Sequence, residues 1–144
     1  ASGMLSSKDD NLSRTYQLNQ RTTGGTQTVL QIDSQNFQSL PAFKDNSTWQ
    51  FEGKVVARVE SSSGSAGQGD SHVWEFEGVV EVTGGSSRIV GQPAISTVAS
   101  DSSVSGYSLS ININANQELE LQVAGNSNDT VNWSARLETI ELVA

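Results

Sequence analysis

The sequence predicts an all-β protein, an antiparallel β-sandwich of about eight strands with a jelly-roll-like arrangement. Three observations lead to this prediction. Apolar residues alternate with polar ones along most apolar segments, which is the period of a half-buried strand. Over a third of the 144 residues are Ser, Thr, Asn or Gln, and Ser, Thr and Asn compete with helical hydrogen bonds. Clusters of Gly, Ser and Asn separate these segments, as turns do.

The strands follow one another along a single domain. Residues 1–11 are expected to be a flexible arm or an expression remnant, and residues 12–144 the sandwich. The alternation places strands at 12–18, 26–33, 47–60, 72–82, 94–100, 107–113, 119–123 and 130–143. In the last segment the apolar phase runs from Val131 to Leu137 and then shifts to Ile140 and Leu142. This shift predicts a bulge or bend near Glu138–Thr139.

Two of these segments nearly repeat each other, as WQFEG at 49–53 and WEFEG at 74–78. Paired as an antiparallel hairpin, with residue numbers adding to about 131, their apolar faces fall on one side. Lys54 would then lie opposite Glu77, and Arg58 diagonal to Glu75. A placement of the two strands in facing sheets stays open. Either arrangement predicts a core that contains Trp49, Phe51, Trp74, Phe76 and Trp133.

Composition excludes several classes of function. A net charge of −8 and a pI near 4.4 argue against binding nucleic acid or anionic membranes. The absence of Cys excludes disulfides and thiolate metal sites, and His72 is the single histidine. No apolar run approaches the ~18 residues of a membrane-spanning helix, so we expect no membrane insertion.

The sequence offers little for catalysis. Glu52 and Glu77 are the residue type of a glycosidase carboxylate pair, but both fall on the charged face of their strands beside Lys54 and Arg58. No Gly-x-Ser-x-Gly elbow is present. We therefore expect no catalytic residues, no cofactor and no metal site, and a protein that is not an enzyme.

Four blocks of sequence resemble a domain that recurs in tail-fibre, tailspike and other structural proteins of tailed bacteriophages. They are TTGGTQTVL at 22–30, DNSTWQFEGKVVARV at 45–59, WEFEGVVEV with GSSRIVG between 74 and 91, and VNWSARLETIEL at 131–142. Two of these blocks carry the family's patterns. The pattern of the block at 45–59 consists of Asp45-Asn46-Ser47, Trp49, Phe51 and Val55-Val56-Ala57-Arg58. The pattern of the closing block consists of Trp133, Ala135, Arg136, Thr139 and Glu141. The resemblance covers roughly residues 12–143.

The resemblance implies a homotrimeric β-sandwich at or near the end of a fibre or spike. Its role would be contact with a receptor, such as a bacterial surface polysaccharide, or assembly of the fibre. It implies no catalysis, since the enzymatic activity of tailspikes lies in β-helical domains. The location would be the virion tail, assembled in the host cytoplasm. A carbohydrate-binding module of a secreted bacterial enzyme is the alternative function.

Two groups of residues are candidates for these roles. Valines that interrupt the charged strand face, with one arginine, are the expected subunit interface: Val56, Val73, Val79 and Arg136. Polar groups of the loops are the expected glycan contacts, because their amides and carboxylates bond sugar hydroxyls: Asp70, Asn126, Asn128 and Asp129.

Overall fold

The computed structural model describes residues 11–32 and 45–143. Their elements, in chain order, are β1 (Asn11–Thr23), β2 (Thr28–Val29), β3 (Gln31–Ile32), β4 (Ser47–Ser62), β5 (Ser71–Thr83), β6 (Ser86–Ile89), β7 (Ala94–Ser100), the 3₁₀ turn η1 (Ser102–Val104), β8 (Ser108–Ile113), β9 (Leu119–Ala124) and β10 (Asp129–Val143). None of the described residues forms a helix long and apolar enough to span a bilayer.

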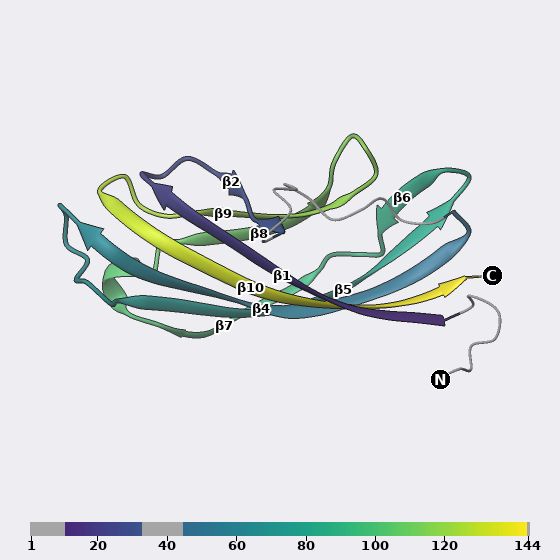
Figure 1. Ribbon diagram of the computed structural model, residues 1–144, viewed down its shortest axis with the longest axis horizontal. Helices are drawn as coiled ribbons and strands as arrows, with labels where there is room; N and C mark the ends of the chain where they lie inside the picture. The colour runs from purple at the N-terminus through teal and green to yellow at the C-terminus, as the bar shows by residue number, and fades with distance from the viewer. Residues whose placement is uncertain (1–10, 33–44, 144) are drawn as a thin grey trace.

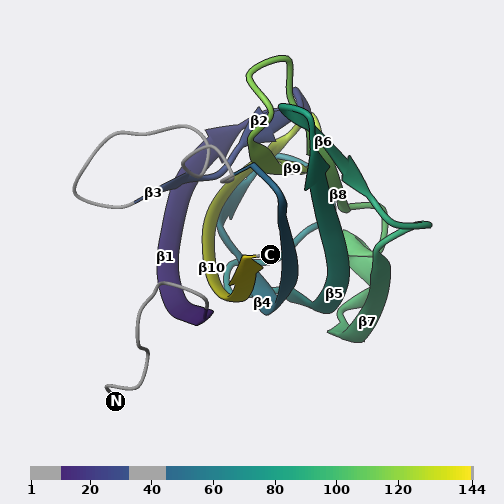
Figure 2. The same cartoon turned by 90° about the vertical axis from the view of Figure 1, so that its right-hand side faces the viewer.

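The strands form two antiparallel sheets. The larger has the order β3-β1-β10-β4-β5-β6, with β7 also paired to β5, and the smaller has the order β2-β9-β8. The large sheet is strongly curved, and the small sheet lies in its hollow (Figure 1). The end view shows β1, β10, β4 and β5 wrapping around this hollow, with β7 and β8 on the same flank (Figure 2). The all-β, antiparallel prediction is confirmed, and the two layers fit a sandwich; the jelly-roll arrangement stays a prediction.

One hydrophobic core fills the space between the sheets. Along most of β4 and β10 every second residue is buried, as the alternation predicts. The core combines side chains of both sheets, among them Val55, Leu137, Leu121 and Val123. Trp49, Phe51, Trp74, Phe76 and Trp133 are all buried in it. The even-numbered side chains of β4 and β10 point the other way, onto the convex face of the large sheet, which we call the outer face.

The repeated WQFEG and WEFEG stretches are adjacent strands, and their packing explains the repetition. Phe51 lies opposite Gly78, and Phe76 lies opposite Gly53. A Cβ at Gly78 would lie 2.5 Å from Cζ of Phe51, and one at Gly53 would lie 2.8 Å from Cζ of Phe76. Each ring therefore occupies the space that a side chain on the facing strand would need. The two strands are a hairpin within one sheet, and the facing-sheet alternative is wrong.

The predicted register of this hairpin is also wrong, by two residues. Lys54 lies opposite Glu75, not Glu77, and Glu52 faces Glu77 directly. Arg58 lies opposite Ser71. The predicted register would have set Gly53 against Gly78, leaving a gap in place of a ring. Aromatic rings over glycines thus outweigh the charge pairs that suggested the other register.

The predicted bulge near Glu138–Thr139 is absent. The ladder of β10 with β1 is unbroken from Thr130 to Leu142, and its only shift against β4 lies between Thr130 and Val131. The phase is therefore kept, so Thr139 and Glu141 are buried whereas Ile140 and Leu142 are exposed. Sequence reasoning read these two apolar side chains as inward because they are apolar.

The strand positions agree with expectation, with a few differences. β1 is longer than predicted and begins at Asn11, β2 and β3 divide the segment 26–33, and β6 was not predicted as a strand. Residues 1–10 of the expected arm lie outside the described residues. Gly84 and Gly85, both with positive φ, turn the chain back between β5 and β6.

We predict that Gly78→Ala destabilises the fold by about 1–3 kcal/mol or more, because the added methyl group must displace the Phe51 ring. Chemical denaturation measures this. Gly106→Ala is the matched control, since its Cβ would meet nothing closer than 3.8 Å. Equal stability of the two variants would contradict the packing described for Phe51 and Gly78.

Candidate functional site

The polar residues predicted to contact a glycan lie at one end of the sandwich, where the β4–β5 and β9–β10 loops meet the segment around η1. The backbone N–H of Ser63 donates to the carbonyl of Asn128 at 3.0 Å. The Ser103 hydroxyl donates to the Asp70 carboxylate, and Asn126 Nδ2 donates to the Ser103 carbonyl at 3.5 Å. The structure therefore brings together loops that are far apart in sequence.

Asp129 is at the centre of this end but is not accessible. It is only 2% exposed. Its Oδ1 accepts a hydrogen bond from the Ser62 hydroxyl at 2.5 Å, and its Oδ2 accepts one from the Tyr107 hydroxyl at 2.6 Å. Burial, together with the Asp129 carboxylate, raises the pKa of Tyr107 well above its usual range. Asp129 as a glycan contact is thus a wrong assignment, because the carboxylate is used to tie β4, β10 and the η1–β8 segment together.

Asp70 is at the surface of the same end, with its carboxylate already engaged. Asp70 Oδ2 accepts from the Ser103 hydroxyl and, at 2.8 Å, from the backbone N–H of Gly67. These bonds, the Ser103 one first, lower the pKa of Asp70 below its ordinary value. The carboxylate therefore stays ionised well into the acidic range and holds the β4–β5 loop in shape.

Asn128 is the most available of the four predicted loop residues. It is exposed, and its side chain packs beside Gly64 of the β4–β5 loop. Asn126 is partly exposed. Sequence reasoning missed Ser62, Ser103 and Tyr107, which hold these loops. Their only signal was their residue type, and Ser is the commonest residue in this chain.

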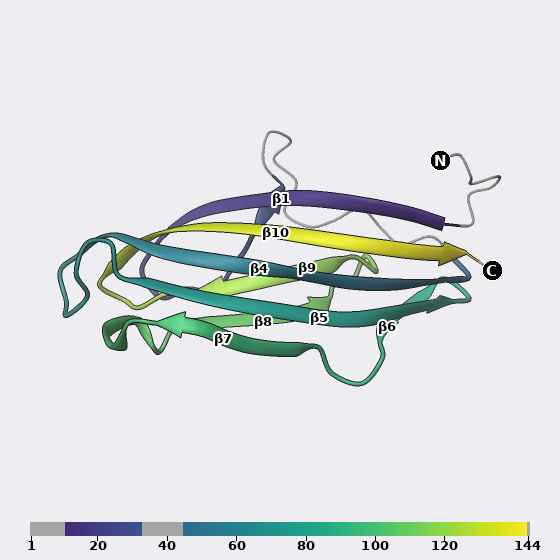
Figure 3. The same cartoon turned by 90° about the horizontal axis from the view of Figure 1, so that it is seen from below.

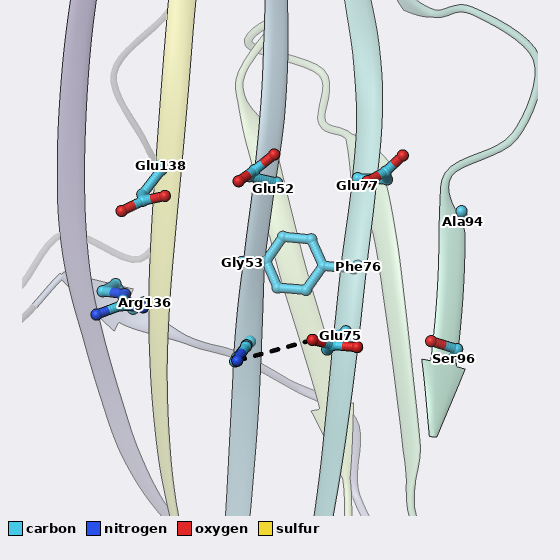
Figure 4. A pocket seen from close by; sticks show the side chains of 10 residues that line it. Glu52, Gly53, Glu75, Phe76, Glu77, Ala94, Ser96, Arg136 and Glu138 are labelled. Atoms are coloured by element: carbon cyan, nitrogen blue, oxygen red, sulfur yellow. Dashed lines mark ion pairs between the residues drawn. The ribbon is translucent and has the colours of Figure 1, made fainter. Parts of the chain in front are cut away.

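The outer face of the large sheet carries charged side chains in register. Glu138, Glu52 and Glu77 lie directly opposite one another across β10, β4 and β5. Figure 4 shows these carboxylates in one line, with Arg136 and Glu75 in the row below. They border a shallow depression of about 300 Å³ that also includes Phe76 and Ser96.

The electrostatics of this depression are mixed. Lys54 Nζ lies 3.7 Å from Glu75 Oε2, an exposed pair of the kind worth about 0–1 kcal/mol. Like charges opposite one another, as in the glutamate row, are destabilising. Within the described ranges no group of three or more His, Asp or Glu is placed to hold a metal ion. Glu52 and Glu77 are exposed neighbours on an open sheet face.

The residues predicted for a subunit interface lie on this same face but only partly together. Val56 lies opposite Val73, and Val73 lies opposite Ala99 of β7. Val79 lies opposite Gln50, and Arg136 opposite Lys54, each in a different row. Val56 is 43% exposed, while Val73 and Val79 are partly buried.

The residues of the sequence motifs described above make contacts that organise the fold. Trp133 Nε1 donates to Thr22 Oγ1 at 2.8 Å and so joins the closing motif to the opening one. Trp49 Nε1 donates to Ser47 Oγ at 2.8 Å. Asp45 Oδ1 accepts from the backbone N–H of Gly85 at 3.0 Å, which ties the start of β4 to the β5–β6 turn. The Trp133–Thr22 and Gly85–Asp45 bonds therefore join motif segments that are distant in sequence.

The aromatic side chains form a buried stack near the loop end. His72 stacks on Trp74 with ring centroids 3.9 Å apart, Trp74 lies 6.1 Å from Trp133, and Trp133 lies 5.7 Å from Tyr107. His72 is buried against the carbonyl of Val104 and the hydroxyl of Ser100. None of the three tryptophans is thus placed to stack on a sugar from solution.

Comparison with solved structures finds similar folds in tailspike proteins of Acinetobacter phages. That of Acinetobacter baumannii phage AM24 has 10% identity and a TM-score of 0.49, covering 88% of this chain and 26% of that one. The tailspike gp49 of A. baumannii bacteriophage Fri1, described as a capsular polysaccharide depolymerase, has 12% identity and a TM-score of 0.42. The match covers 93% of this chain and 18% of gp49. The tailspike protein of Acinetobacter phage vB_ApiP_P1 has 16% identity and a TM-score of 0.34. The match covers 94% of this chain and 22% of that one.

This chain therefore spans about a quarter or less of the length of each of those tailspikes. No protein-family model matches the sequence, and no curated protein matches it.

We predict that Tyr107→Phe lowers the free energy of unfolding by about 1–3 kcal/mol, because it removes a hydrogen bond from the buried Asp129 carboxylate. Denaturant titration measures the loss. Tyr16→Phe is the control, since Tyr16 is partly buried and its hydroxyl donates to none of the residues that the structure describes. A Tyr107→Phe variant as stable as this control would show that Asp129 does not depend on the phenol.

Proposed function

We propose that this chain is a non-catalytic domain of a phage tail fibre or tailspike, carried on the virion, which binds a polysaccharide of the host surface and takes part in a homotrimer. The observation that carries the proposal is the meeting of the shared motifs in the fold. Trp133 Nε1 donates to Thr22 Oγ1, and the backbone N–H of Gly85, the first residue of GSSRIVG, donates to Asp45 Oδ1. The resemblance in sequence thus rests on residues that act together, which supports a common fold and a common structural role.

Polysaccharide binding fits the loop end better than the sheet faces. Asn126 and Asn128 offer amides, and exposed serines of the β4–β5 loop, Ser63 and Ser65, offer hydroxyls. The hydrogen bonds of Asp70 and of the buried Asp129 hold these loops in place, so the donors and acceptors are pre-positioned. A carbohydrate-binding module that relies on a flat aromatic platform fits less well, because Trp49, Trp74 and Trp133 are buried.

A trimer also fits the surface. Val56 on the outer face is 43% exposed, and Val98 of the neighbouring β7 segment is 54% exposed. Apolar residues gathered on a surface mark contact with other chains. Closed rotational symmetry would bury such residues of each copy against its neighbour.

The first test is the mass in solution. Light scattering coupled to size exclusion should give about 46 kDa, three times the 15.3 kDa of one chain. Specific interfaces of standard size bury about 1,600 Å² and hold stable complexes, so an assembled trimer should remain intact on the column. A mass of one chain at tens of micromolar protein would remove the trimer from the proposal.

The second test is binding without turnover. The protein should bind at least one purified bacterial capsular polysaccharide in a panel, and the double variant Asn126→Ala/Asn128→Ala should bind at least tenfold more weakly because it loses two amides. Asn116→Ala, exposed in the turn between β8 and β9, is the matched control. Release of new reducing ends by the wild type, abolished in Glu77→Gln, would contradict the non-catalytic role.

A further inference from the structure

β7 is an edge strand that has no partner on one side. It pairs with β5 through residues 72–77, and no other described strand pairs with it. All seven of its residues are exposed, including Ile95 at 37% and Val98 at 54%. A strand edge of this kind presents a row of backbone donors and acceptors that can pair with another chain.

The sequence of β7 lacks the residues that usually prevent such pairing. Natural edge strands carry Lys or Pro or point charges inward, and AISTVAS has neither lysine, proline nor any charge. A bulge does interrupt the strand opposite Val73 and Trp74, but the residue it adds is the apolar, exposed Val98. The bulge therefore displays an aliphatic side chain where a protective charge would be expected.

The flank around β7 is almost free of charge. Between Arg88 and Glu118 the single charged residue is Asp101, although the chain carries a net charge of −8. β8, the edge of the small sheet, belongs to this segment and lies on the same side of the molecule as β7 (Figures 2 and 3). Two copies of an acidic protein would repel each other across most of their surfaces, and least across this flank.

An apolar strip connects this flank to the outer face. Val56, Val73 and Ala99 lie directly opposite one another across β4, β5 and β7. Val98 follows next to Ala99. The contact surface available to a partner is therefore continuous, from the backbone edge of β7 across to Val56.

We propose that the uncharged flank formed by β7, together with the Val56–Val73–Ala99 strip, is the surface on which a second copy of this chain docks. The proposal deepens the homotrimer of the proposed function by naming its contact surface. A second copy fits this surface because it also carries a net charge of −8 and meets the least electrostatic repulsion at an uncharged flank. A protein chain can also pair with the backbone donors and acceptors of the whole strand edge. In a closed ring of three, this flank of each copy would lie against a different surface of the next.

The test introduces charge at the edge without weakening the monomer. In Val98→Lys a 54% exposed valine becomes a lysine, and in Ser96→Lys the new ammonium faces Glu75 across the strands, an attractive pair. Each variant should reduce the mass measured by light scattering about threefold relative to the assembled wild type. Ile140→Lys, 55% exposed on the outer face and away from β7, is the matched control and should leave the mass unchanged.

The outcomes separate this inference from the proposed function. A trimer that persists in both β7 variants, at an unchanged melting temperature, overturns the inference and leaves the trimer standing. Dissociation in Ile140→Lys alone overturns it too, and places the contact around β10 and β1, away from Val56 and β7. A wild type of one-chain mass overturns both the trimer and the docking surface, while binding of capsular polysaccharide would still support the receptor role.

Discussion

The packing of two phenylalanine rings over two glycines is the constraint on which the rest of the structure depends. Phe51 over Gly78 and Phe76 over Gly53 allow one register between β4 and β5, because a shift by two residues would put glycine against glycine. Burying a phenylalanine contributes about 1.5–3 kcal/mol, whereas an exposed cross-strand charge pair contributes about 0.2–1 kcal/mol. The packing of the two rings therefore determines the register of β4 and β5, and this register in turn fixes which charged side chains of the outer face lie opposite one another. The line of Glu138, Glu52 and Glu77 is one such result.

The sequence predicts the strands well and their fine pairing poorly. Strands buried on one face alternate, so β4, β5 and β10 are recognisable from a window of a dozen residues. Their register depends on contacts between residues distant in sequence, such as Phe51 and Gly78, which alternation does not encode. The end of β10 shows the limit of the polarity rule. Thr139 and Glu141 are inside and Ile140 and Leu142 outside because the hydrogen-bonded ladders on both sides keep the strand in phase.

The loop end could be predicted as polar and clustered, but not as a network. Asp129 resembled an accessible turn aspartate because its neighbours are Asn, Ser and Thr. Its true partners, Ser62 and Tyr107, are 67 and 22 residues away. Burial of a carboxylate is possible here only because both of its oxygens receive hydroxyl donors. A single sequence has no signal for such a pairing, whereas the uncharged segment around β7 is visible in it at once.

The arrangement of β1 and β10 also determines how the domain would respond to mechanical force. β1 begins and β10 ends at the same end of the sandwich, where Asn11 lies opposite Leu142 (Figure 1). Tension that pulls Asn11 and Leu142 apart would break the hydrogen bonds between β1 and β10 sequentially, one pair at a time. Tension along the strands, applied at opposite ends of the sheet, would instead load many pairs at once. The domain is therefore mechanically weak in the first direction and strong in the second.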